Sequence, residues 1–243
     1  MPCITVTGMA TFIKPAVKPQ PERSEMIEIK GKIDLAALLS SRICHDLISP
    51  VGALSNGIEI LAEEVDDEMR DQTIALLTHS VNEATGRLQM LRLAFGGSTS
   101  LGGVINVGDG EHAFREYLAT SKVTLDWRTE LEALPKPAMK LLMNLALVAS
   151  ESIIRAGTLT VQAAASPGGV QLTATASGDR ILVSDDVSAI FGGTATEESV
   201  DAKSVPAVLA MMLADELGGR IACQRGHSNE FVILAELPQM AIS

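Results

Sequence analysis

The sequence has few aromatic, cysteine and basic residues, and each scarcity narrows the possible functions. Aromatic residues make up 3% of the 243 residues and hydrophobic residues 47%, so the predicted core is built from aliphatic side chains. The three cysteines, Cys3, Cys44 and Cys223, are an odd number without metal-ligand spacing, which indicates a reducing compartment rather than a disulfide framework. Lysine and arginine number 19 against 30 acidic residues, and the net charge of −11 argues against nucleic-acid binding, because phosphate contacts need clustered basic side chains.

Long apolar runs are also missing. No run reaches the length of a membrane span, and the first residues lack the basic start, apolar core and cleavage site of a secretory signal. We therefore expect a cytoplasmic protein without membrane association. Residues 1–29 contain four prolines among polar residues and are interpreted as a disordered leader.

What the sequence does contain is two long helical repeats within residues 30–98. Apolar residues recur every three or four positions over about 33–65 and again over about 67–95, a spacing typical of amphipathic helices. An acidic run at 63–68 marks the turn of the predicted hairpin, and Gly96 is its expected glycine C-cap. A hairpin this long cannot cover both apolar faces alone, so we predict a homodimer whose hairpins form a four-helix bundle. The alternative is a monomer in which the hairpin packs only on its own C-terminal domain.

The pattern changes after residue 98, and residues 99–243 are predicted to form an α/β sandwich, which makes the protein α+β overall. The expected sheet is mostly antiparallel, with helices on one side. A loop rich in glycine, threonine, serine and acidic residues is expected at 192–204. Helices are expected at 110–120, 135–156 and 205–217, and strands at 123–128, 158–164, 170–176, 181–183, 221–224 and 230–237.

His45 is the strongest candidate for chemistry. It lies two residues from both Ile43 and Leu47, and two steps of about 100° point its side chain away from the apolar stripe of the helix. Pro50 removes a helical hydrogen bond and is expected to bend the helix just past the histidine. A neutral imidazole nitrogen is a competent nucleophile, and Asp46 is expected to orient the ring or take up its proton. The alternative is an ordinary solvent-facing histidine beside an acid.

The surroundings of His45 carry a family resemblance. Residues 44–53, CHDLISPVGA, resemble the phosphoacceptor box of two-component histidine kinases. Together with residues 93–96, LAFG, they are similar to ChpT-type histidine phosphotransferases of alphaproteobacteria. The resemblance covers roughly residues 33 to 238 in element order. It implies a C-terminal domain like the histidine kinase ATPase domain, with the Bergerat fold.

The same resemblance implies that the nucleotide site of this domain is degenerate. Asn144 matches the start of the asparagine box, although its simplest role is in a cap or turn. Val148 stands where a magnesium-ligating asparagine is expected, and valine has no oxygen for a hard cation. Ala176 and Arg180 replace an acid and a glycine of the adenine-reading turn, and residues 192–204 lack a Gly-x-Gly run. We expect this chain to bind no cofactor and no metal.

The resemblance implies a phosphorelay protein. His45 would accept a phosphoryl group from the receiver domain of a hybrid histidine kinase of the CckA type and pass it to response regulators of the CtrA and CpdR type. Magnesium would sit on the receiver. The expected docking face combines apolar and small side chains around the histidine with two arginines that would meet the acidic pocket of a receiver: Ile48, Ser49, Gly52, Ala53, Asn56, Arg155 and Arg180.

Two alternatives to the relay remain open. The first is an ATP-dependent histidine kinase with an unusual nucleotide pocket. The second is a non-catalytic scaffold that binds receivers without carrying a phosphoryl group. For Arg180, a solvated surface arginine is the simpler interpretation.

Overall fold

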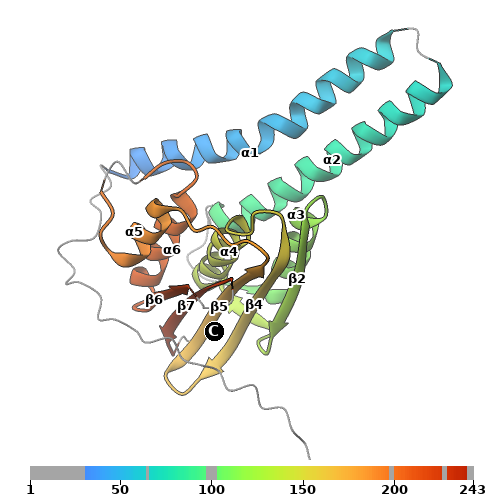
Figure 1. Ribbon diagram of the computed structural model, residues 1–243. Helices are drawn as coiled ribbons and strands as arrows, with labels where there is room; N and C mark the ends of the chain where they lie inside the picture. Colours follow the sequence, from blue (N-terminus) through green and yellow to red (C-terminus); the bar gives the residue numbers. More distant parts are fainter. Residues whose placement is uncertain (1–30, 64–65, 97–102, 197–199, 226–228, 240–243) are drawn as a thin grey trace, which may run out of the picture.

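The computed structural model in Figure 1 describes residues 31–63, 66–96, 103–196, 200–225 and 229–239. A helical hairpin projects from an α+β domain. The leader predicted at 1–29 lies outside the described residues. Within the described part of the chain, no helix is both long and apolar enough to cross a membrane.

The hairpin consists of α1 (Gly31–Ala62) and α2 (Asp67–Phe95), which run antiparallel. The sequence predicted that the first helix reaches residue 65, which is wrong because α1 ends at Ala62. Asp66 is the N-cap of α2, and its side chain accepts a hydrogen bond of 2.8 Å from the main-chain N–H of Met69. Gly96 ends α2 as predicted, although with φ −55° rather than the left-handed geometry of most glycine caps.

Both helices bury one stripe and expose another. At the inner contact the helices approach closely, since a Cβ added at Gly57 would lie 2.7 Å from Cδ2 of Leu77. The outer stripe of α2 repeats every seven residues and is about half exposed, at Ile74 (48%), Val81 (49%) and Leu88 (54%). On α1, Val51 (53%) and Ile58 (62%) are also seven residues apart. A heptad of exposed apolar side chains on each helix is typical of helices that pair with further helices.

The C-terminal domain is built on a five-stranded sheet in the order β2-β4-β5-β7-β6. The pair β2–β4 is parallel and the other pairs are antiparallel, so the sheet is mostly antiparallel as predicted. Helices cover one face of the sheet (Figure 1), which confirms the predicted fold class. The strands are β2 (Lys122–Thr129), β4 (Ala156–Ser166), β5 (Gly169–Gly178), β6 (Arg220–Arg225) and β7 (Glu230–Pro238), and the helices are α3 (Val107–Leu118), α4 (Lys136–Glu151), α5 (Asp185–Gly192) and α6 (Val205–Glu216).

Three parts of this domain differ from the prediction. Two short strands, β1 (Val104–Asn106) and β3 (Ala133–Pro135), form a separate sheet that the sequence did not indicate. The strand expected at 181–183 is only one isolated bridge between Ile181 and Ile153. Helix α5 was also missed, although Ser184 caps its first turn by accepting from the N–H of Val187 at 3.2 Å.

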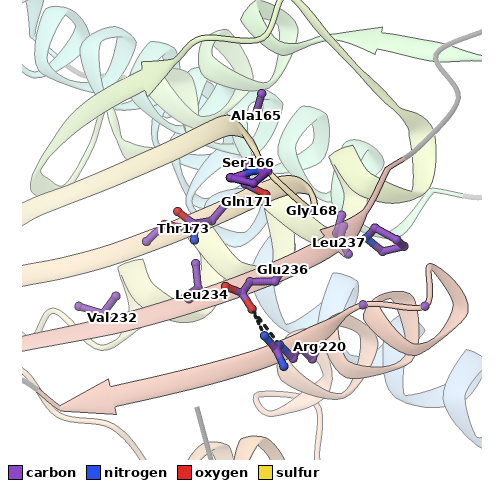
Figure 2. Close-up of a pocket in the computed structure, with 14 residues that line it drawn as sticks. Ala165, Ser166, Gly168, Gln171, Thr173, Arg220, Val232, Leu234, Glu236 and Leu237 are labelled. Carbon is purple, nitrogen blue, oxygen red and sulfur yellow. Dashed lines mark hydrogen bonds and ion pairs between the residues drawn. The ribbon is translucent and has the colours of Figure 1, made fainter. Parts of the chain in front are cut away.

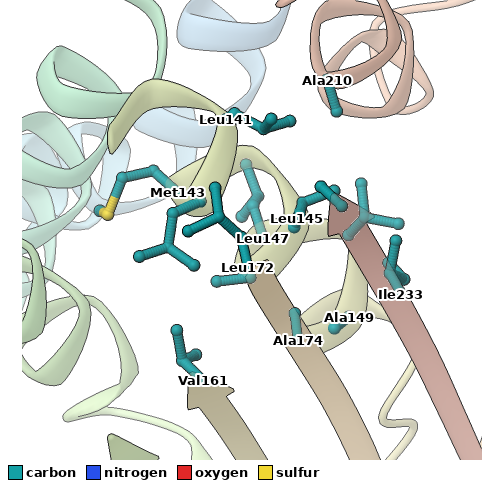
Figure 3. Packing of buried hydrophobic residues seen from close by; sticks show 14 of the residues in the cluster. Leu141, Met143, Leu145, Leu147, Ala149, Val161, Leu172, Ala174, Ala210 and Ile233 are labelled. Carbon is teal, nitrogen blue, oxygen red and sulfur yellow. The ribbon is translucent and has the colours of Figure 1, made fainter. Parts of the chain in front are cut away.

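Helix α4 lies at the centre of the core. Its side chains pack between the sheet and the other helices, where Leu145 and Leu147 lie near Leu172, Ala174 and Ile233 (Figure 3). The predicted helix ran to residue 156, but α4 ends at Glu151. Near this end the main-chain N–H groups of Ser152 and Ile153 donate to the carbonyls three positions earlier, the tighter pattern typical of a helix end.

None of the helices that the structure describes covers the opposite face of the sheet (Figure 1). It carries a groove of about 840 Å³, whose floor includes Gln171, Thr173 and Leu234 and whose rim includes the ion pair between Arg220 and Glu236 (Figure 2). Sheet residues alternate between faces, so these side chains point away from the core that α4 fills.

The base of the hairpin is tied to the domain through Asn144. This side chain is fully buried in the middle of α4, and its Nδ2 donates to the carbonyls of Ala94 in α2 at 3.0 Å and Lys140 at 2.8 Å. The expectation that Asn144 belongs to a cap or turn is therefore wrong. Nearby, Gly86 of α2 contacts the main chain of α3 at Glu116, where no larger residue fits. These contacts fix how the hairpin sits on the domain.

Candidate active site

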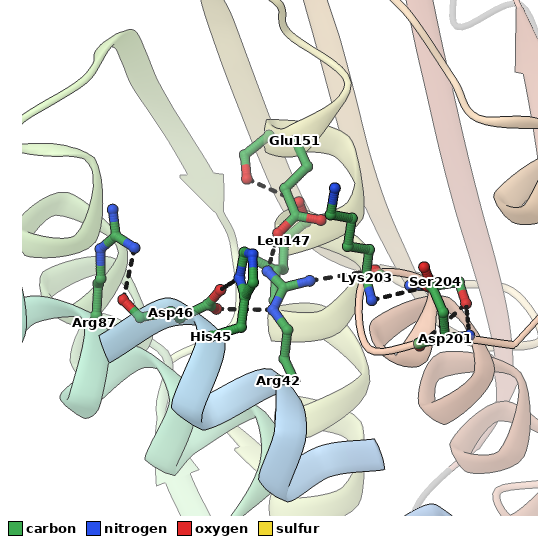
Figure 4. Close-up of polar contacts among 10 residues, drawn as sticks. Arg42, His45, Asp46, Arg87, Leu147, Glu151, Asp201, Lys203 and Ser204 are labelled. Carbon is green, nitrogen blue, oxygen red and sulfur yellow. Dashed lines mark hydrogen bonds and ion pairs between the residues drawn. The ribbon is translucent and has the colours of Figure 1, made fainter. Parts of the chain in front are cut away.

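His45 lies in the middle of α1 on the side that faces solvent. Its side chain is 62% exposed, and Nδ1 lies 3.1 Å from Oδ1 of Asp46 (Figure 4). The Asp46 side chain is only 9% exposed, because it turns inward toward the rest of the protein. An accessible imidazole therefore stands against a buried carboxylate, the pair that the sequence singled out.

This contact favours one tautomer of the neutral ring. An ionised carboxylate only accepts hydrogen bonds, so Nδ1 must carry the proton that it shares with Asp46. The other nitrogen, Nε2, is then left with a free lone pair. The geometry presents Nε2 as a nucleophile to a molecule that approaches from solvent.

Arg42 holds the carboxylate from the other side. Its Nε donates to Oδ2 of Asp46 at 2.8 Å, and its two terminal nitrogens reach the carboxylate of Glu151 and, at 3.2 Å, the carbonyl of Lys203 (Figure 4). Burial alone would lower the pKa of Arg42, but Glu151 and then Asp46 outweigh it, so the pKa lies above its ordinary value. Arg42 therefore stays charged although its side chain is only 5% exposed. Sequence reasoning missed this residue, whose one local signal is its i,i+4 spacing to Asp46.

Arg87 of α2 holds the main chain of the same residue. Pro50 has no N–H, so the carbonyl of Asp46, four residues earlier, lacks its helical donor. Nη1 of Arg87 donates to that carbonyl at 2.8 Å, while its other terminal nitrogen pairs with Glu83. Helix α1 continues through Pro50, with the missing bond replaced from the neighbouring helix. No local pattern indicated this role for Arg87, because the contact joins the two helices of the hairpin.

The predicted docking residues on α1 are accessible. Ile48 is 72% exposed, Ser49, Gly52 and Asn56 are also exposed, and Ala53 is half-buried. A Cβ placed on Gly52 would meet nothing within 4 Å. The turn that follows His45 therefore presents small side chains to solvent, together with one large apolar side chain, Ile48.

The two predicted arginines lie on neighbouring segments of the C-terminal domain. Both side chains are exposed, and the N–H of Ile154, next to Arg155, donates to the carbonyl of Arg180 at 3.2 Å. Ile154 and Leu182 add exposed apolar surface beside them. This patch continues past the end of α4, whose last residue, Glu151, is bonded to Arg42. Arg155 thus follows, by four residues, the helix end that is bonded to Arg42.

The residues at the nucleotide position do not fit a magnesium-bound triphosphate. Val148 is 5% exposed and lines a cavity of about 210 Å³ between α4, the start of α5 and residues 201–204. Small-molecule pockets usually measure roughly 300–1,000 Å³. Ala176 is fully buried inside β5. Among the residues that the structure describes, no three histidine, cysteine or acidic side chains meet in a way that could hold a metal ion.

Comparison with known proteins gives matches along most of the chain. Residues 107–229 match the family model for the histidine phosphotransferase C-terminal domain. The protein phosphotransferase ChpT of Brucella abortus (strain 2308) is 39% identical over 190 residues, which cover 78% of this chain and 90% of that protein.

Solved structures agree with these matches. A bacterial phosphotransferase solved at 1.7 Å superposes with a TM-score of 0.75 at 36% identity, covering 85% of this chain and 97% of its own. The histidine kinase ThkA, in its complex with the response regulator protein TrrA, has a TM-score of 0.50 at 17% identity and covers 86% of this chain and 63% of its own. At that identity the kinase shows a shared fold alone.

Proposed function

Because this chain belongs to the ChpT-type histidine phosphotransferase family, we propose that His45 is the residue that carries the phosphoryl group in its phosphorelay. The donor is an aspartyl phosphate on the receiver domain of a hybrid histidine kinase, and the acceptor is an aspartate on a response regulator. The observation that carries this proposal is the exposed ring of His45, held through Nδ1 by the buried carboxylate of Asp46.

The transfer itself is an in-line displacement at phosphorus. The lone pair of Nε2 attacks the phosphorus as the bond to the aspartyl oxygen breaks, and the receiver's aspartate leaves as a carboxylate. The ring keeps its Nδ1 proton and becomes cationic, so the hydrogen bond to Asp46 becomes charge-assisted and stronger. Transfer to the second receiver reverses the step, and Nε2 leaves as part of a neutral imidazole.

The proposed docking surface for receivers joins the His45 face of α1 to the arginine patch of the C-terminal domain. The acidic pocket of a receiver, which carries its own magnesium ion, suits Arg155 and Arg180, and Ile48 supplies an apolar anchor. By family resemblance the donor is of the CckA type and the acceptors are of the CtrA and CpdR type, in the cytoplasm.

The hairpin supports a proposed homodimer. The exposed heptad on α2, from Ile74 through Val81 to Leu88, and the pair Val51 and Ile58 on α1 supply apolar faces that a second copy would cover. Two hairpins joined through these faces make a four-helix bundle with a His45 site on each copy.

ATP is not the proposed phosphoryl source. The side chain of Val148 offers no ligand, and the 210 Å³ cavity beside it is smaller than most small-molecule pockets, which supports this proposal. The rival interpretation as a kinase needs ATP binding at this position, whereas the rival interpretation as a scaffold needs receiver binding without a phosphorylated intermediate.

One labelling experiment separates these functions. The protein is mixed with a hybrid kinase, with or without its receiver domain, and radiolabelled ATP, and wild type is compared with His45→Ala. Label that reaches wild type only through the receiver, and never reaches His45→Ala, is the expected result. Label taken directly from ATP would identify a kinase. Receivers that bind wild type and His45→Ala equally, with no label on either, would identify a scaffold.

A further inference from the structure

The C-terminal domain reaches the His45 site through one buried guanidinium. We propose that Glu151 and Arg42 are positioning residues for phosphoryl transfer, in which Glu151 at the end of α4 fixes Arg42 and Arg42 fixes the carboxylate that orients His45. This inference rests on the proposed function of His45. It gives the domain a part in the reaction that needs no nucleotide.

Every nitrogen of the Arg42 guanidinium has a partner. Nε meets Asp46, one terminal nitrogen meets Glu151, and the other meets the carbonyl of Lys203. The planar group cannot rotate without breaking one of these contacts, because its donors form a rigid fork. Its orientation is therefore set by the C-terminal domain, which supplies two of the three partners from sequence positions more than 100 residues away.

The carboxylate of Asp46 is divided between two partners in the same way. Oδ2 accepts from Arg42 and Oδ1 accepts from His45, one donor to each oxygen. A rotation of the carboxylate that follows Arg42 would pull Oδ1 away from Nδ1. The ring would then lose the partner that keeps its proton on Nδ1 and leaves Nε2 free.

The charge of the cluster formed by Arg42, Asp46 and Glu151 also favours a positioning role for Glu151. The positive charge of Arg42 is shared between two carboxylates, so the cluster carries a net charge of −1 when both are ionised; burial raises the pKa of Glu151, and Arg42 opposes that rise. That negative charge favours the cationic ring that forms when Nε2 bonds to phosphorus. Without Glu151 the cluster would be neutral, and Asp46 would stabilise the phosphorylated ring less well. Arg87 and its partner Glu83, which also face this turn, balance each other.

Stability alone is a weak reason for such a cluster. Taking an arginine and a carboxylate out of water is unfavourable, and their attraction often does no more than offset that cost. The Arg42 and Asp46 side chains are 5% and 9% exposed, so this cost applies to both. We infer that the cluster instead holds the Asp46 carboxylate in the orientation that contacts the imidazole of His45.

The test compares Glu151→Gln and Glu151→Ala with wild type in the full-length protein. Single-turnover transfer from a phosphorylated receiver, at saturating receiver, is expected to slow about ten- to a hundredfold, because a displacement of about 1 Å can reduce a rate about a hundredfold. Receiver affinity is expected to stay unchanged. Glu111→Gln is the matched control, since it removes an exposed i,i+4 pair with Arg115 that does not touch the site.

The deciding readout is the tautomer of His45, measured by nitrogen NMR. Wild type is expected to show the proton on Nδ1, and Glu151→Ala a mixture of both tautomers. Arg42→Lys, which keeps the charge but loses the fork, is expected to resemble Glu151→Ala. A wild-type ring protonated on Nε2 would overturn the inference without any variant, even if Glu151→Ala fails to fold.

Other outcomes separate this inference from the proposed function. Glu151→Gln with wild-type rate and tautomer, on a protein that carries label on His45, would overturn the positioning role alone. A slower rate with an unchanged tautomer and a lower melting temperature would make Glu151 merely structural. Reduced receiver affinity at an unchanged saturated rate would make it a docking residue. Label on His45→Ala would instead overturn the phosphoacceptor assignment itself.

Discussion

Arg87 hydrogen-bonds the main-chain carbonyl of Asp46, which is the acceptor that Pro50 leaves without a helical donor. A charged side chain on α2 thus completes the backbone of α1 at the turn that carries His45. The relationship joins three residues that the sequence separates by up to 41 positions, and it makes Arg87 and Pro50 energetically dependent on each other.

Arg87→Met is expected to destabilise the protein by about 1–3 kcal/mol, because it leaves a partly buried carbonyl without a donor. In a Pro50→Ala background the cost of Arg87→Met should be smaller, since residue 50 then supplies its own N–H. Urea denaturation of the four variants in this double-mutant cycle measures the coupling. Glu83→Gln controls for the ion pair that Arg87 also makes. Equal costs in both backgrounds would show that Arg87 does not replace the missing helical bond.

Gly52→Glu is expected to abolish phosphoryl transfer without unfolding the protein. The position is open, so the added side chain meets nothing within its own chain, but it would stand in the proposed receiver surface and add charge there. Transfer assays and circular dichroism are the measurements. Gly52→Ala is the control, which should keep transfer and gain up to about 1 kcal/mol from helix propensity. Normal transfer by Gly52→Glu would reject the docking model.

Gly86→Ala is expected to have the opposite effect on stability from Gly52→Ala. Its Cβ would lie 2.8 Å from the carbonyl oxygen of Glu116 and 2.9 Å from the carbonyl carbon, and main-chain atoms of a packed helix cannot give way cheaply. We expect a loss of about 1–3 kcal/mol, measured by urea denaturation. A neutral or stabilising result would mean that α2 and α3 do not cross as closely as described.

Val81→Glu is expected to convert the protein from a dimer to a monomer. Val81 is the centre of the exposed heptad on α2, where a charge would face the second copy. Sedimentation velocity at micromolar concentration is the measurement. Met212→Glu, at another exposed apolar position but on α6, should leave the association state unchanged. A wild-type protein that sediments as a monomer would instead favour the alternative in which the hairpin packs only on its own domain.

The sequence was sufficient for elements whose signal is local. The two helices of the hairpin, α4, α6 and the β4–β5 and β6–β7 hairpins all follow from periodicity and turn residues, and the exposed ring of His45 follows from its phase on α1. Helix α5 was missed although its signal was present, since Ser184 and Gly193 bracket it as caps. Strands β1 and β3, at three residues each, are too short to produce a readable pattern.

The supporting contacts of the site could not be predicted, for a different reason. Arg42 meets Glu151 across 109 positions and Lys203 across 161, and such pairings depend on how the hairpin sits on the domain rather than on any local pattern. Asn144 illustrates the same limit. The sequence around it is compatible with a helix interior or a cap, and does not indicate that its amide is fully buried. The nearest local clue, Arg42 four residues before Asp46, describes a common surface pair and not a buried one.

The bond from Asn144 to Ala94 has a mechanical consequence. One amide bridges the last turn of α2 and the middle of α4, at the base of a lever about 30 residues long. Because this hydrogen bond joins the two helices directly, we expect the base of α2 and the middle of α4 to move together rather than independently. A change in the angle of the hairpin at this point would therefore also displace α4, whose last residue, Glu151, is bonded to Arg42.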